Sequence, residues 1–373
     1  MSINIKIILT LVLVLVIFFI SPFGRGIYKS LLLVSETVPN FPVRPLKYFA
    51  KAPEVAEVGY SRNGVRTNAD LYLPGDSRKH PAIILTLGTL VTRKSDAVVN
   101  LSKALAKIGY VVLIPELPEF VNGLIWTDSV NSLIASYNYL DGNPKVINSK
   151  IGFVGFCAGA SVAMVAAQDT QIFDKVAFIS AISPFYDGNS MVKATLLNQQ
   201  VVEGRVEVWR PAKLTQDSLN QFFMNVVENQ DDRKVLVQYL NSRQNMSEED
   251  FNKLSADSQS IYNFIKNSQA ESFEELKEQL PKGIKEALSQ VSPSNNISRL
   301  KAKVLILNDK KDTFVPRSEG FQFVNNLPRE QIYFKEVDSF EHVSPATNLP
   351  RWAAIRQVWH LGSFLYKFIK ETS

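Results

Sequence analysis

Ile151-Gly152-Phe153-Val154-Gly155-Phe156-Cys157-Ala158-Gly159 is the stretch of sequence that decides the fold of this chain. Ile151–Phe156 consists of apolar residues and glycine, which predicts a buried strand. The small and apolar residues from Ala160 to Ala167 predict a helix that begins almost at once. So short a turn forces Cys157 into a strained conformation, and the flanking glycines let strand and helix approach closely. The Cys157 side chain should therefore project above the carboxyl edge of a sheet.

Strands and helices alternate on both sides of this stretch. Further strands are predicted at Ala82–Leu87, Tyr110–Ile114 and Val176–Ile182, with helices at Ala97–Ile108 and Ser129–Leu140. A hairpin around Asn63-Gly64, a strong two-residue turn signal, precedes them. This βαβαβ order predicts the α/β class, with a mostly parallel, twisted sheet of about eight strands and helices on both faces.

The alternation is interrupted in the second half of the chain. Residues 191–297 are polar and helix-like without a convincing strand, and we interpret them as an inserted helical lid. Strands resume at Lys303–Asn308 and Gln331–Val337, and a final amphipathic helix is expected at Trp352–Ile369. The core therefore comprises residues 55–190 and 298–373. Residues 26–54, which contain several prolines, are predicted to form a linker.

The N-terminus is the segment that does not look globular. Counted from Ile3 to Ile20, its apolar run is about 18 residues long, near the lower limit for crossing a bilayer. Residues 1–25 are therefore predicted to be an uncleaved membrane anchor, with the catalytic domain outside the cytoplasm. A signal peptide, whose cleavage would give a secreted protein, is the main alternative, although Ile20-Ser21-Pro22-Phe23 is a poor cleavage site.

Composition excludes several classes of site. The net charge is only +5 and there is no basic stripe with interleaved aromatic residues, which argues against nucleic-acid binding. Cys157 is the only cysteine, so an intrachain disulfide is impossible and a cysteine-based zinc site is disfavoured. Chemistry that needs a histidine has three candidates: His80, His342 and His360.

Cys157 is well placed for nucleophilic chemistry. A helix N-terminus directly after it favours the thiolate form of the side chain. The backbone N–H of Ala158 lies at the same helix end, where it can stabilise an oxyanion. The alternative interpretation is a structural cysteine buried beside two packing glycines.

Two further segments make the pattern specific. Val304–Pro316 is a predicted strand and loop that contains Asp312, and Phe340-Glu341-His342-Val343 follows the next strand. Together with the Cys157 turn, these motifs resemble the α/β-hydrolase superfamily, in particular its dienelactone hydrolase-like group with a cysteine nucleophile. The resemblance implies that Cys157 is the nucleophile, that His342 is the base and that Asp312 orients the imidazole.

Alternatives to two of these assignments stay open. Asp309 and Asp187 are other candidates for the acid, since some related enzymes draw it from an earlier strand. His360 lies in the final helix and is interpreted as a packing residue. His80 precedes a strand, at the opposite end of the sheet from the expected site.

The loop Leu87-Gly88-Thr89-Leu90 should supply a second oxyanion donor. The resembling family usually has a His-Gly pair here, and the backbone N–H of Thr89 or Leu90 could still donate because the side chain matters little for this role. Arg93 and Lys94 follow closely. They could contact an anionic substrate, or they could belong to a solvated turn.

The reaction implied is hydrolysis of a small-molecule ester, lactone or thioester through an acyl-cysteine, without a metal or organic cofactor. Amides fit less well because a thiolate is expelled in preference to an amine. An alternative is a catalytically silent α/β-hydrolase-fold protein that binds an apolar ligand or partner under the lid. A serine-type peptidase is disfavoured because no serine occupies the sharp turn.

Overall fold

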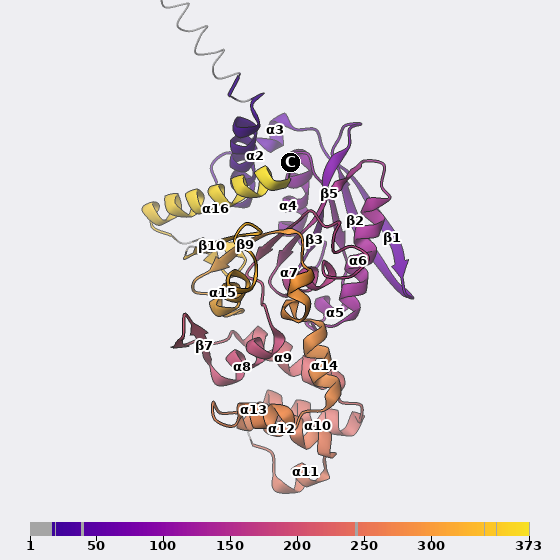
Figure 1. Cartoon of the computed structure of the whole chain (residues 1–373), viewed down its shortest axis with the longest axis vertical. Coiled ribbons are helices and arrows are strands. Elements are labelled where there is room, and N and C mark those ends of the chain that lie inside the picture. Colours follow the sequence, from indigo (N-terminus) through magenta and orange to yellow (C-terminus); the bar gives the residue numbers. More distant parts are fainter. Residues whose placement is uncertain are drawn as a thin grey trace, which may run out of the picture.

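The computed structural model describes residues 17–18, 20–38, 41–242, 245–338, 340–347 and 349–372. Its centre is a sheet whose strands are β1 (Glu54–Arg62), β2 (Val65–Leu73), β3 (His80–Thr86), β4 (Val111–Pro115), β5 (Val146–Phe156), β6 (Phe178–Ile182), β9 (Lys303–Asp309) and β10 (Ile332–Val337). The eight strands lie side by side in the order β1-β2-β4-β3-β5-β6-β9-β10 (Figure 1). Within this sheet, the antiparallel pairs are β1 with β2 and β2 with β4. The prediction of a mostly parallel sheet is confirmed.

Local sequence explains these strands. β4 is buried at every position, as expected for an apolar strand covered on both faces. Asn63 (φ 50°) and Gly64 (φ 81°) both take the left-handed conformation that the two-residue turn between β1 and β2 requires. The hairpin predicted around Asn63-Gly64 is therefore present.

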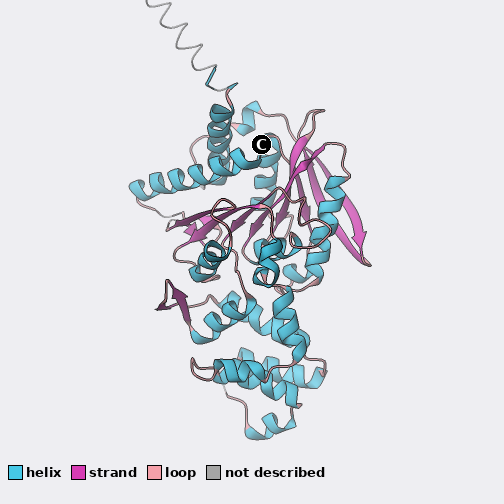
Figure 2. Ribbon diagram, in the orientation of Figure 1, coloured by secondary structure: helices cyan, strands magenta, loops and turns pink. Residues whose placement is uncertain are grey.

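Helices cover both faces of the sheet (Figure 2). One face packs against α6 (Asp128–Asp141), α7 (Ala158–Ala166) and α15 (Arg317–Asn326). The other face packs against α2 (Pro22–Thr37), α4 (Asp96–Lys107) and α16 (Arg351–Thr372). Two short helices, α3 (Leu46–Phe49) and α5 (Pro118–Val121), lie in connecting segments.

The region interpreted as a lid is a helical insertion between β6 and β9. It comprises α8 (Gly188–Leu197), β7 (Gln199–Val202), β8 (Arg205–Val208), α9 (Lys213–Val226), α10 (Gln230–Asn241), α11 (Glu248–Lys253), α12 (Ala256–Asn267), α13 (Phe273–Glu278), α14 (Lys282–Gln290) and the 3-10 helix η1 (Pro293–Arg299). Figure 1 shows it as a separate layer below the sheet. It has its own core, centred on Phe223, Phe264 and Ile284. The β7–β8 hairpin was not predicted, because its strands are short and half of their residues are exposed.

The prediction of an N-terminal membrane anchor is wrong. Within the described part of the chain, no helix is both long and apolar enough to cross a bilayer. Residues 1–16 and 19, which make up most of the apolar run, lie outside the described residues. The first helix after them, α2, carries Arg25 and Lys29 and buries Leu33 and Val34 against the protein itself. The extracytoplasmic location was inferred from the anchor, and it is therefore not supported either.

The predicted linker also differs from the structure. Residues 26–37 belong to α2, which packs against α16 and α4 and forms part of the core on that face of the sheet. The prolines of the predicted linker, at positions 39, 42, 45 and 53, all follow α2, so they carry no information about residues 26–37.

A buried carboxylate ties the insertion to the core. Glu319, in the first turn of α15, accepts hydrogen bonds from the backbone N–H groups of Tyr186 (2.8 Å) and Asp187 (3.0 Å). Its other oxygen accepts from the Ser190 hydroxyl at 2.6 Å. These three residues lie where the chain leaves β6 and enters α8. Burial raises the pKa of Glu319 to about 7.

The free energy of unfolding should therefore fall as pH rises from 4.5 to about 7. Over this range the folded protein keeps Glu319 protonated while the unfolded chain ionises it, so the loss amounts to roughly 3 kcal/mol. Urea unfolding of the wild type and of Glu319→Gln at several pH values measures it. In the variant, a glutamine oxygen can still accept both N–H groups, and its amide can donate to Ser190. The free energy of unfolding of the wild type should fall relative to that of Glu319→Gln as pH rises over this range. A difference between the two proteins that does not change with pH would contradict the prediction.

Candidate active site

Cys157 occupies a strained turn between β5 and α7. Its φ of 52° and ψ of −134° lie outside the regions that L-residues favour. A hydrogen bond from its own N–H to the Ile182 carbonyl (2.9 Å) holds this conformation. The turn also demands glycine on both sides. A Cβ added to Gly155 would lie 2.4 Å from the Ala160 Cα, and one added to Gly159 would lie 2.1 Å from the Leu87 carbonyl oxygen.

His342 reaches the same edge of the sheet from a different segment. It lies in the turn between β11 (Phe340–Glu341) and β12 (Ser344–Pro345), with a left-handed φ of 62°. Its Nδ1 lies 2.6 Å from Oδ2 of Asp312, in the loop after β9. The other oxygen of Asp312 accepts hydrogen bonds from the backbone N–H groups of Phe314 (2.7 Å) and Val315 (3.0 Å). The Asp312 carboxylate is thus buried, fully bonded and pointed at the imidazole.

The other candidate acids have different partners. Asp309 accepts hydrogen bonds from the backbone N–H groups of Lys311 and His342, each at 3.0 Å, so it fixes the loop that carries the imidazole. Asp187 caps α8 through the N–H groups of Asn189 and Ser190. Asp312 is therefore the candidate acid whose side chain contacts the imidazole.

The other histidines lie elsewhere. His80 contacts Asp76 at 2.7 Å, at the start of β3 and so at the opposite edge of the sheet. His360 lies on α16. Of the three histidines, His342 is the one that faces Cys157.

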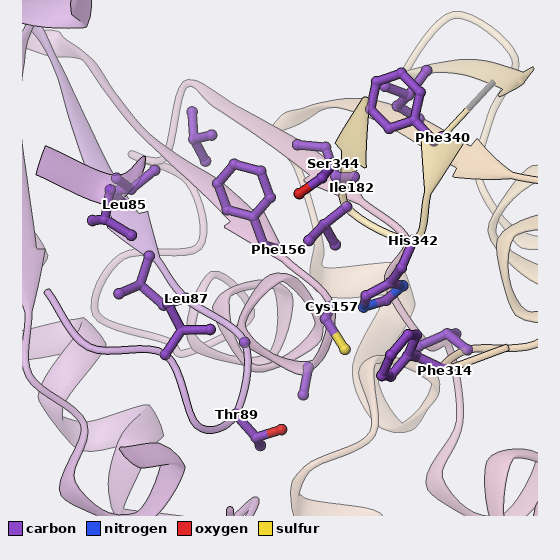
Figure 3. Close-up of a pocket in the computed structure, with 18 of the residues that line it drawn as sticks. Leu85, Leu87, Thr89, Phe156, Cys157, Ile182, Phe314, Phe340, His342 and Ser344 are labelled. Atoms are coloured by element: carbon purple, nitrogen blue, oxygen red, sulfur yellow. The ribbon is translucent and has the colours of Figure 1, made fainter. Parts of the chain in front are cut away.

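The Cys157 sulfur and the His342 ring face one another across the mouth of a pocket (Figure 3). Burial alone would lower the pKa of His342, but the charge of the Cys157 thiolate and hydrogen bonds with Asp312 and Cys157 outweigh it and raise the pKa to about 10. The Phe314 ring stacks on the imidazole, with centroids 4.5 Å apart and planes inclined by 27°. The contacts with Cys157 and Asp312 therefore favour the imidazolium form of His342, with the ring orientation set from two sides.

The two segments expected to supply oxyanion donors, the start of α7 and the loop after β3, both lie next to Cys157. Ala158 is the first residue of α7, so its N–H has no acceptor within the helix. Gly88 brings the β3 loop into contact, since a Cβ there would lie 3.3 Å from the Cys157 Cβ. The N–H of Leu90 already donates to the Phe120 carbonyl at 2.7 Å, which removes Leu90 as a donor. Thr89 remains the candidate from this loop, and it lines the same pocket as Cys157.

Arg93 and Lys94 do not face a substrate. Arg93 donates to Glu57 and Glu116, each at 2.6 Å, and also pairs with Asp70. Lys94 donates to Asp70 at 2.7 Å. Arg93 is buried against β1 and β2 and does not fit the solvated turn, whereas Lys94 is an exposed turn residue and does.

Residues 121–202, which include the Cys157 turn, match the dienelactone hydrolase family. Three solved structures share the architecture. They are 2,6-dihydroxy-pseudo-oxynicotine hydrolase (14% identity, TM-score 0.50, covering 84% of this chain and 68% of that one), a puromycin-hydrolyzing peptidase from Mycobacterium tuberculosis (14%, 0.52, 88% and 40%) and an acylaminoacyl peptidase from Pyrococcus horikoshii (13%, 0.50, 87% and 41%). This chain has the α/β-hydrolase fold. It spans about two fifths of the length of each peptidase. No curated protein sequence matches it.

The insertion braces the acid loop, which sequence reasoning missed. The Trp209 indole donates to the Asp312 carbonyl (2.7 Å), and the Thr215 hydroxyl donates to the Phe314 carbonyl (3.0 Å). No local signal links Trp209 to a loop so distant in the chain. Phe314 could have been suspected, since it follows the acid motif directly.

A largely apolar cavity of about 740 Å³ opens beside Cys157 and His342. The insertion forms part of its wall, through α8, α9 and α14. Its size is typical of small-molecule sites, which usually measure about 300–1,000 Å³.

Proposed function

We propose that this α/β-hydrolase cleaves ester, thioester or lactone bonds through a triad of Cys157, His342 and Asp312. One observation carries the proposal: a thiol on a strained turn faces an imidazole that a buried carboxylate holds in place. The dienelactone hydrolase match across the turn supports a hydrolase. The insertion then acts as the lid of the site, because it walls the cavity and braces the acid loop.

The reaction proceeds in two balanced steps. The Cys157 thiolate attacks the carbonyl carbon and forms a C–S bond, while the N–H groups of Ala158 and Thr89 stabilise the oxyanion. The oxyanion collapses, the C–O bond breaks, and the leaving alkoxide takes a proton from His342. Neutral His342 then takes a proton from water, and the resulting hydroxide attacks the thioester. The C–S bond breaks, which releases the acid and restores the thiolate and imidazolium.

Asp312 keeps the imidazole oriented throughout. It stabilises the charged ring after each proton uptake, and its other oxygen is held by two backbone N–H groups. Amides fit this scheme less well than esters. The tetrahedral intermediate of an amide expels the thiolate more readily than the amine.

Trapping the acyl-enzyme tests the proposal. The full chain, including α2, is mixed with p-nitrophenyl butyrate, quenched in acid and analysed by intact-mass and peptide mass spectrometry. We expect p-nitrophenol release with a butyryl group on Cys157, and neither with Cys157→Ala. A catalytically silent protein that only binds an apolar ligand would give neither in the wild type.

A further inference from the structure

The residues that line the cavity come from two different parts of the fold. One part of the cavity lies against the sheet face that α2, α4 and α16 cover; we call it the inner arm, lined by Leu33, Leu85, Leu101, Leu105, Ser180 and Phe364. The other lies under the insertion; we call it the outer arm, lined by Met191, Ser218, Leu219, Phe222 and Leu288. In Figure 3, Leu85, Phe156 and Ile182 lie on one side of Cys157 and Thr89 lies on the other.

A single small residue leaves room for the inner arm. Ser180 is central in β6, and it shares its face with Phe178 and Ile182. It pairs with Val154 on one side and Leu305 on the other, in a face otherwise filled by large apolar side chains. Close packing would require a leucine or isoleucine at such a position. The serine is 3% exposed and lines the cavity, so part of the cavity lies where a larger side chain would fill the core.

The outer arm differs in its surroundings. It is formed by helices of the insertion, and Ser218 and Leu219 on α9 are only half-buried. It therefore suits a group that need not be fully desolvated. The inner arm lies within the main core and offers chiefly aliphatic and aromatic contacts.

We infer that the inner arm binds a linear, saturated acyl chain of the substrate, while the alcohol group lies in the outer arm. This inference rests on the proposed function, since the acyl carbonyl must lie at Cys157. An apolar space inside a core can admit an unbranched chain, whereas a charged group would lose its hydration there. The substrate class is thus a fatty-acyl ester or thioester.

Chain length tests this inference through hydrolysis. Burial of one methylene group is expected to raise kcat/KM by up to about fourfold until the arm is full. p-Nitrophenyl acetate, butyrate, octanoate and dodecanoate are compared for the wild type, Ser180→Leu and Ser218→Leu. Ser180→Leu should lower the rate for dodecanoate by about tenfold or more, with acetate changed by less than about twofold. Ser218→Leu, the same change in the outer arm, should leave the length preference intact.

Calorimetric titration with free dodecanoate, rather than its p-nitrophenyl ester, separates this inference from the catalytic proposal. The Cys157→Ala variant should bind dodecanoate, and Cys157→Ala with Ser180→Leu should not. Leu101→Trp, at a half-buried helix position of the inner arm, serves as a second filling variant if Ser180→Leu does not fold. Binding that Ser180→Leu and Leu101→Trp leave unchanged, or that Ser218→Leu alone abolishes, would overturn the inference whether or not esters are hydrolysed. If Cys157→Ala binds dodecanoate but p-nitrophenyl esters do not acylate Cys157 in the wild type, the result would instead count against the proposed function.

Discussion

Cys157→Ala should lower the hydrolysis of p-nitrophenyl esters by about 10⁴-fold or more, because no other group can form the acyl intermediate. The side chain is half-exposed at the cavity, so its truncation leaves the core intact. The strained backbone of the turn is held by the Ile182 carbonyl rather than by the sulfur. The melting temperature should therefore stay close to that of the wild type.

Cys157→Ser is the matched control for this variant. It keeps a nucleophile at the turn but removes the thiolate charge that helps to raise the pKa of His342. We expect activity between those of the wild type and Cys157→Ala. An alanine variant that keeps more than about a tenth of the wild-type rate would show that the turn is not the reacting centre.

His342→Ala should slow the alkylation of Cys157 by iodoacetamide at neutral pH by about tenfold or more. An isolated cysteine thiol, with a usual pKa of about 8.5, is only about 3% thiolate at pH 7. In the wild type, His342 keeps its proton up to about pH 10, and its positive charge lies beside the sulfur throughout that range. The advantage of the wild type should therefore shrink as pH rises and vanish near pH 10, where the imidazole loses its proton.

The rate of alkylation as a function of pH is the measurement, with His360→Ala as control. That histidine lies on α16 and should leave the profile unchanged. A constant ratio between wild type and His342→Ala at all pH values would indicate a steric effect, and equal rates would indicate that the two side chains do not interact.

Together the two results separate an enzyme from a silent scaffold. An apolar ligand could fill the cavity in either case, so the cavity does not decide between them. The reactivity of the Cys157 thiol, and its dependence on the His342 imidazole, decide between an enzyme and a silent scaffold.

The sharp turn was predictable because its causes are local. A strand that ends at Phe156 and a helix that begins at Ala158 leave one residue to reverse the chain, and only glycine fits on either side of it. The same holds for the Asn63-Gly64 turn, whose conformation those two residues adopt at little cost. The anchor and the linker were mispredicted for the opposite reason. An apolar run does not reveal that α16, far away in the sequence, packs against α2, and the prolines at positions 39, 42, 45 and 53 lie beyond that helix.

The amino-acid order by itself determined the parallel sheet, the position of Cys157 and the succession of cysteine, aspartate and histidine, because periodicity and turn chemistry act between near neighbours. Tertiary structure decided which of two aspartates three positions apart meets the imidazole, and it withdrew the Leu90 N–H by giving it the Phe120 carbonyl. It also decided that Ser180 would open a cavity within the core. These outcomes depend on hydrogen bonds and packing between distant segments, which a local pattern does not encode.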